Sequence, residues 1–61
     1  MSINVLVIEE SNRARKHIVR SLMEIGVNHV TEAADVDKAV NEFQQHQFDT
    51  ILIDWNIRTS A

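Results

Sequence analysis

Residues 48–54 read FDTILID, and this stretch is the strongest indication of fold in the chain. Its centre, residues 51–53, is apolar without interruption, which is typical of a strand buried on both faces of a sheet. A second apolar run, VLVI at residues 5–8, is followed directly by the acids Glu9 and Glu10. Asp54 closes the first run in the same way, so two predicted buried strands both end in carboxylates.

An amphipathic helix is predicted directly after the strand that contains residues 5–8. Apolar residues recur at helical spacing from residue 14 to residue 25. Ser11 or Asn12 is expected to cap its N-terminus, and Gly26 is expected to end it because glycine adopts left-handed conformations without a Cβ penalty. Its first turn carries the basic run RARK at residues 13–16, for which a solvated face is the default interpretation and a docking surface the alternative.

A second helix is predicted after Asp35, a plausible N-cap, and is expected to fade near residues 45–46. Its apolar stripe ends at Phe43, which is expected to pack in the core together with Met23. Three strands, at residues 3–8, 30–33 and 48–54, would then alternate with two helices. Short connections and this alternation favour a parallel sheet with right-handed crossovers.

Composition limits the chain to one small domain. A chain of 61 residues buries only about 60% of the surface that its unfolded form exposes. The absence of cysteine excludes disulfides and thiolate metal sites. The formal charge of −3 argues against non-specific nucleic-acid binding. No apolar run reaches membrane-spanning length and the N-terminus lacks a signal-peptide pattern, so a cytoplasmic location is expected.

The strand-end acids are the best functional lead. Ligands of parallel α/β sheets bind beyond the carboxyl ends of the strands, so Glu9, Glu10 and Asp54 converge if the first and third strands are neighbours. Hard oxygen ligands suit Mg²⁺, and a carboxylate can also attack phosphorus to form an aspartyl phosphate. The alternative is that these acids lie in solvated loops or cap helices.

The chain resembles the N-terminal part of a response-regulator receiver domain of two-component signalling, from about residue 5 to residue 57. The most specific stretch is FDTILIDWNI at residues 48–57, because a buried strand followed by Asp and then x-x-apolar is similar to the phosphoacceptor motif of that family. Further similarity lies in VLVIEES at residues 5–11, in Arg15, and in the apolar helix ending at Gly26. It continues through EA at residues 32–33 and Asp35 with Ala39.

The resemblance implies an α/β, flavodoxin-like receiver fold truncated to β-α-β-α-β, with residues 1–61 forming a partial receiver domain and a parallel sheet of order 2-1-3. It implies that Asp54 is the phosphoacceptor, the residue that receives the phosphoryl group in a phosphorelay. It further implies that Glu9, Glu10, Asp54 and the backbone carbonyl of Asn56 hold Mg²⁺. The expected partner is a histidine kinase or a phosphotransfer protein, and the chain would be a signalling phosphoacceptor rather than a turnover enzyme.

Three departures from the family pattern weaken the inference that this chain has the family's function. The acidic pair is Glu-Glu, whereas the family usually has Asp-Asp or Glu-Asp, and the extra methylene shifts each carboxylate. Arg58 stands where the family usually has proline, and its cation is close enough in sequence to pair with Asp54. The later strands that supply a Ser or Thr and a Lys in the family have no counterpart in these 61 residues. The alternative is therefore a non-catalytic pseudo-receiver, a self-associating interaction module or a fragment.

The third strand is also expected to be an open, apolar edge. Such edges invite pairing with another chain, so we expect a homodimer or larger assembly joined through residues 50–54. Neither nucleic acid nor a membrane is an expected partner.

Overall fold

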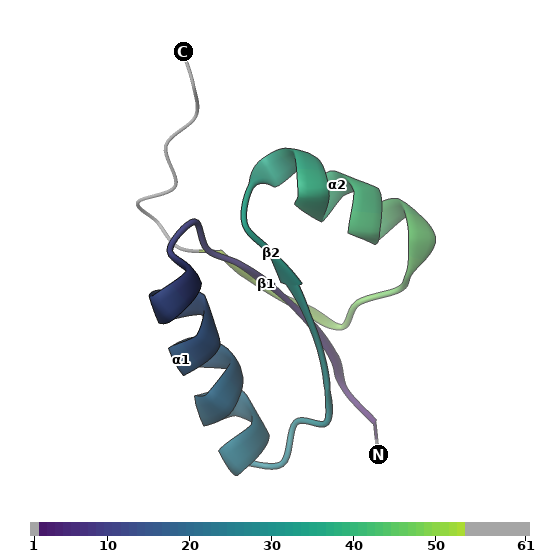
Figure 1. Ribbon diagram of the computed structural model, residues 1–61. Helices are drawn as coiled ribbons and strands as arrows, with labels where there is room; N and C mark the ends of the chain where they lie inside the picture. Colours follow the sequence, from purple (N-terminus) through teal and green to yellow (C-terminus); the bar gives the residue numbers. More distant parts are fainter. Residues whose placement is uncertain (1, 54–61) are drawn as a thin grey trace.

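The computed structural model describes residues 2–53 of the chain (Figure 1). Within them strands and helices alternate in the predicted order. The elements are β1 (Asn4–Ile8), α1 (Asn12–Glu24), β2 (His29–Ala33), α2 (Val36–Gln45) and β3 (Thr50–Ile53). None of the helices in this part of the chain is long and apolar enough to cross a membrane.

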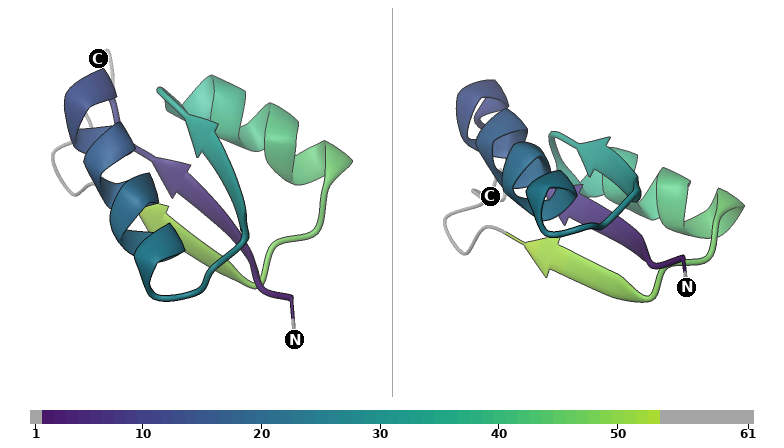
Figure 2. Two further views of the ribbon diagram at one scale, coloured as in Figure 1. Left: turned by 60° about the horizontal axis from the view of Figure 1, so that its bottom comes forward. Right: turned by 90° about the horizontal axis from the view of Figure 1, so that it is seen from below.

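The three strands form one parallel sheet in the order β2-β1-β3, which confirms the predicted α/β fold and its strand order. β1 is the central strand, and the register pairs Ile8 with Ala33 on one side and with Ile53 on the other. Figure 2 shows α1 and α2 on opposite faces of the sheet and β3 at its edge. This arrangement brings the carboxyl ends of all three strands to the same edge.

Both helices begin at the predicted caps. The Ser11 side chain accepts a hydrogen bond from the Ala14 backbone N–H at 3.2 Å, which selects Ser11 over Asn12 as the cap of α1. The Asp35 carboxylate accepts one from the Lys38 backbone N–H at 2.7 Å at the start of α2. α1 ends just before Gly26, whose φ of 102° is open to glycine at no steric cost.

β3 is shorter than predicted, because the segment before it makes other bonds. The Asp49 backbone N–H donates to the Asn4 carbonyl at 2.8 Å, and the Asp49 carboxylate accepts from the Asn4 backbone N–H at 2.9 Å. Phe48 is half-buried and packs against the core cluster. Residues 48–49 therefore lead into the strand, which begins at Thr50.

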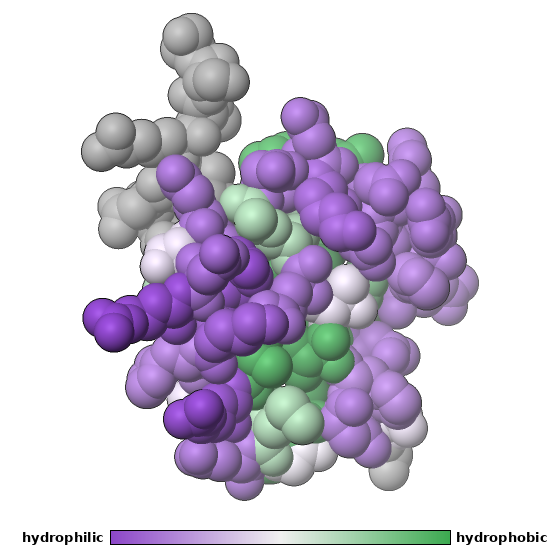
Figure 3. Space-filling model, viewed as in Figure 1, coloured by the Kyte–Doolittle hydropathy of each residue, from purple (hydrophilic) through white to green (hydrophobic). Residues whose placement is uncertain are grey.

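The core is built around β1. Its buried members are listed here: Val5, Leu6, Val7, Ile8, Ala33 and Ala39. The prediction that Met23 and Phe43 pack in this core is wrong, since they are 59% and 57% exposed. Met23 lies on α1 and Phe43 lies on α2. Other described elements leave both side chains largely uncovered. Figure 3 shows hydrophilic residues over the outer surfaces of the helices and hydrophobic residues between them.

β3 is not buried on both faces as its sequence predicts. Ile51, Leu52 and Ile53 are 41%, 36% and 58% exposed. A strand becomes inaccessible only when elements lie beside it and over both faces, as they do for β1. Among the described residues β3 has one neighbouring strand, and neither helix fully covers it. Within residues 2–53, β3 is thus an edge strand with partly exposed apolar side chains.

Candidate carboxylate site at the end of the sheet

Glu9 lies immediately after β1 and is 4% exposed, although it is an acid. Its backbone N–H donates to the Ala33 carbonyl at 3.0 Å, which extends the pairing of β1 and β2 by one residue. One carboxylate oxygen, Oε1, accepts from the Ser11 backbone N–H at 3.4 Å. The carboxylate is thus held close to the N-terminus of α1, where the helix dipole favours negative charge.

The other predicted site residues divide into two groups. Glu10 is described and exposed, so the two consecutive acids have different environments. Asp54, Asn56 and Arg58 lie outside the described residues. The end of the described part of β3 nevertheless lies near Glu9. Ile53 pairs in register with Ile8, the residue before Glu9, and Ile53 and Glu9 line one groove.

Arg15 organises this end of the sheet. It is buried on α1, and its guanidinium Nη1 donates to the Glu9 backbone carbonyl at 2.8 Å. Nε donates to Glu32 Oε1 on β2 at 3.0 Å, and Nη2 donates to the Asn12 side-chain oxygen. The first turn of α1 is therefore bonded to the ends of two strands by a single side chain.

The expectation of a solvated basic face holds for Arg13 and Lys16, which are exposed, and is wrong for Arg15. The physical reason is the direction of the Arg15 side chain. Arg15 lies three and seven residues before Ile18 and Leu22, so it belongs to the stripe that faces the sheet. That spacing, together with an acid inside the second strand, was the available sequence signal for the Arg15–Glu32 pair.

Glu32 accepts from two cations. Lys16 Nζ donates to Glu32 Oε2 at 3.0 Å while Arg15 donates to the other oxygen. The hydrogen bond from Lys16 is the largest influence and lowers the pKa of Glu32 below its ordinary value of 4.5. Partial burial opposes that change, and the hydrogen bond from Arg15 lowers the pKa further. Glu32 is therefore ionised at neutral pH.

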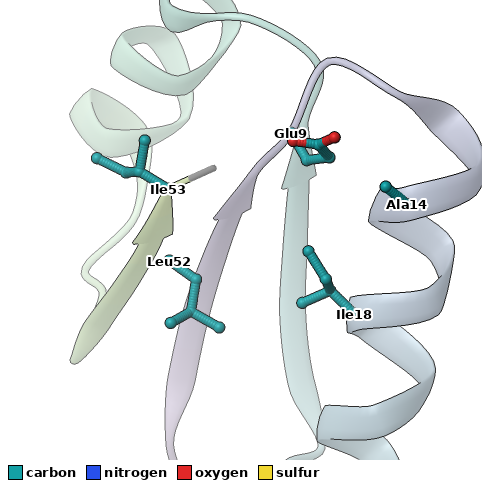
Figure 4. Close-up of a pocket in the computed structure, with 5 residues that line it drawn as sticks. All are labelled: Glu9, Ala14, Ile18, Leu52 and Ile53. Carbon is teal, nitrogen blue, oxygen red and sulfur yellow. The ribbon is translucent and has the colours of Figure 1, made fainter. Parts of the chain in front are cut away.

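A groove of about 420 Å³ opens beside Glu9 between α1 and β3. Its walls are Ala14 and Ile18 from α1 and Leu52 and Ile53 from β3 (Figure 4). Figure 4 shows Glu9 at one end of this groove, with Leu52 and Ile18 entering from its two sides. The arrangement is an apolar groove that has a carboxylate at the end where the parallel strands finish.

Carboxylate oxygens such as those of Glu9 and Glu10 are of the kind that a hard cation prefers, but the buried Glu9 and the exposed Glu10 have different surroundings. Among residues 2–53, no group of three or more His, Asp or Glu side chains is placed to hold a metal ion. The third predicted carboxylate, Asp54, lies outside that range.

The fold and site define a small α/β protein with a parallel sheet and a buried carboxylate at its carboxyl edge. No protein-family model matches the chain, and no match was found among solved structures. The resemblance to receiver domains consequently remains a prediction from the sequence.

Proposed function

We propose that the chain is the phosphoacceptor segment of a response-regulator receiver, and that Asp54 accepts a phosphoryl group from a histidine kinase or a phosphotransfer protein in the cytoplasm. The observation that carries this proposal is the buried carboxylate of Glu9 beside the end of β3. Asp54 follows Ile53 directly in the sequence. A carboxylate at this edge of the sheet agrees with the general position of ligand sites in parallel α/β sheets.

In the proposed reaction a carboxylate oxygen of Asp54 attacks the phosphorus of a phosphohistidine. The new O–P bond forms an acyl phosphate while the P–N bond breaks, and its electron pair returns to the imidazole nitrogen of the donor. The chain is modified once per event, so it acts as a stoichiometric acceptor rather than as a turnover enzyme.

Glu9, Glu10, Asp54 and the Asn56 carbonyl are the proposed holders of Mg²⁺. When bound, Mg²⁺ would neutralise charge on the phosphoryl oxygens. The contribution of the protein is positional. Arg15 bonds to the Glu9 carbonyl, and the Ser11 N–H bonds to the Glu9 carboxylate, so the direction of this acid is set from both ends.

Acetyl phosphate with Mg²⁺, followed by intact mass spectrometry, tests this proposal. We expect one phosphoryl adduct on the wild-type chain, sensitive to hydroxylamine as an acyl phosphate should be. Asp54→Asn should abolish the adduct. Asp37→Asn is the matched control, because Asp37 is an exposed acid in the first turn of α2 and should leave the adduct unchanged. The proposal fails if wild type gains no adduct or if Asp54→Asn gains the same one.

A non-catalytic interaction module is the second candidate. The exposed apolar side chains of β3 favour it, as does the Glu-Glu pair, which departs from the usual family pattern. Titration with Mg²⁺ while following Trp55 fluorescence separates the two candidates. A saturating change in Trp55 emission that Glu9→Gln weakens supports the phosphoacceptor, whereas a flat titration supports the interaction module.

A further inference from the structure

The main chain of Glu9 is held to β2 at two points. Its backbone N–H donates to the Ala33 carbonyl at 3.0 Å. Its carbonyl accepts from Arg15 Nη1 at 2.8 Å, and Nε of the same guanidinium donates to Glu32 Oε1 at 3.0 Å. Two consecutive residues of β2, Glu32 and Ala33, therefore hold the two backbone groups of Glu9, the first through Arg15 and the second directly.

Glu32 has a distinct part in this arrangement. Arg15 also donates from Nη2 to the Asn12 side chain at the start of α1. Glu9 and Asn12 are the two ends of the connection between β1 and α1, so a guanidinium bonded to them alone would move together with that connection. Within residues 2–53, Glu32 supplies an acceptor on a different element, in a strand that pairs directly with β1. Glu32 thus fixes the guanidinium relative to the sheet.

The sheet register places Glu32 beneath α1. Glu32 pairs with Val7, and Val7 pairs with Leu52, which lines the groove beside α1. A strand position covered by a helix in a parallel sheet is normally apolar. An acid at such a position loses solvation and is stable only with a charged partner. The Glu32 side chain is 29% exposed and has that partner in Arg15, so its position in the strand is explained by the bond to this arginine.

We propose that Glu32 is a positioning residue for the carboxylate site, acting through Arg15 to fix the main chain from which the Glu9 carboxylate extends. This inference rests on the proposed function, in which Glu9 is one of the holders of Mg²⁺. Mg²⁺ requires near-ideal octahedral geometry, so a shift of the Glu9 main chain would misplace a ligand. The alternative is that the Arg15–Glu32 pair only ties α1 to β2 and adds stability.

The second cation on Glu32 provides a matched control. Lys16 Nζ donates to Glu32 Oε2 at 3.0 Å, and the Lys16 side chain is 67% exposed. Lys16→Met therefore breaks one bond to Glu32 and leaves the bond that leads through Arg15 to Glu9. Glu32→Gln is the control for charge. It removes the same negative charge as Glu32→Ala but retains an oxygen that can accept from Arg15 Nε.

The carbonyl ¹³C chemical shift of Glu9 in the metal-free 61-residue chain tests the positioning, because this shift responds to the hydrogen bond that the carbonyl accepts. We expect Glu32→Ala to move the signal, and Glu32→Gln and Lys16→Met to leave it near its wild-type position. Lower stability alone does not move the signals of molecules that stay folded. Circular dichroism establishes that each variant is folded.

If Glu32→Ala does not fold, Arg15→Lys replaces it in both measurements. It keeps the positive charge but lacks the planar fork that bonds to Glu9 and Glu32 together.

Calorimetric titration with Mg²⁺ tests the consequence for the site. We expect a dissociation constant at least about tenfold weaker for Glu32→Ala, since partners that orient metal ligands typically contribute about 10–100-fold to affinity. Glu32→Gln and Lys16→Met should stay within about threefold of wild type, because both keep the acceptor of Arg15 that orients Glu9.

An unmoved Glu9 carbonyl signal in Glu32→Ala, or equal weakening of Mg²⁺ binding by Glu32→Ala and Glu32→Gln, overturns the proposal. A wild type that does not bind Mg²⁺ overturns instead the cation site of the proposed function. The Glu9 carbonyl signal then still decides whether Glu32 positions Glu9, so the two failures are distinguishable.

Discussion

Arg15 Nε lies 3.0 Å from Glu32 Oε1, and this ion pair joins the first turn of α1 to β2. The same guanidinium donates to the Glu9 carbonyl at the end of β1. A helix and the two strands that it connects are thus bonded through one buried cation. Because Glu9 is also the buried acid of the candidate site, the contact links the stability of the fold to the geometry of that site.

Replacing Arg15 with alanine should destabilise the chain by about 2 kcal/mol or more, since hydrogen bonds to charged groups contribute roughly 1.5–3 kcal/mol. The Glu9 carbonyl would lose its donor, and Glu32 would retain Lys16 alone among its two cations. Urea denaturation at one fixed protein concentration measures the change. Arg20→Ala is the control, because Arg20 is exposed on the same helix and its loss should alter the midpoint little. Equal effects of the two substitutions would contradict the structural role of Arg15.

Acid should weaken the fold through Glu32. Its folded-state pKa lies below the unfolded value, chiefly because of the Lys16 hydrogen bond, so the unfolded state binds the proton more readily. The stabilisation is complete above the ordinary pKa of 4.5 and is lost as the pH falls below it toward the lowered folded-state pKa. Urea midpoints from neutral pH down to acid should show a shallower loss for Glu32→Gln than for wild type. Lys16→Met should also reduce the slope, and identical acid profiles for all three proteins would rule out this linkage.

The cap of α1 offers a prediction with a built-in pair. Ser11→Ala removes the acceptor for the Ala14 N–H and should cost about 1 kcal/mol. Ser21→Ala makes the same chemical change at an exposed position inside α1, where alanine has the higher helix propensity, and should be neutral or slightly stabilising. Thermal unfolding followed by circular dichroism compares the two. Loss of stability in Ser21→Ala but not in Ser11→Ala would refute the assignment of the cap.

Truncating Leu6 to alanine should destabilise the fold far more than truncating Met23, a residue of similar size. Leu6 is 1% exposed on β1, so Leu6→Ala should cost about 2–5 kcal/mol. A cost of that size is comparable with the whole stability of a small domain, so we expect an unfolded chain. Met23→Ala removes a side chain of α1 that is 59% exposed and should leave the fold intact. Proton NMR dispersion distinguishes these outcomes, and a folded Leu6→Ala spectrum would show that β1 is not the centre of the core.

Much of the fold could be predicted from local pattern. The apolar runs at residues 5–8 and 51–53, the caps at Ser11 and Asp35, and the ending of α1 before Gly26 all act within a few residues. Each reflects a hydrogen bond or a steric limit that the neighbouring chain supplies. Alternation of strand and helix then restricts the topology, since right-handed parallel crossovers are strongly preferred.

The departures arise where two distant segments meet. β3 begins at Thr50 because Asp49 bonds to Asn4, forty-five residues earlier in the sequence. Phe43 has the helical spacing of a core residue but is exposed, since only part of the apolar stripe of α2 reaches the sheet. Spacing identifies which side of a helix is apolar. It does not state how much partner surface that side will find.

The same difference between local pattern and tertiary contact applies to Glu9 and Arg15 in the candidate site. The sequence alone determined that a carboxylate follows β1, and Glu9 was identified from that position. Only the tertiary structure decided that Glu9 is buried, that Arg15 donates a hydrogen bond to its carbonyl, and that the same arginine donates another to Glu32 on β2. Periodicity is set by the backbone of each segment, whereas burial and ion pairing depend on which surfaces the crossover brings together.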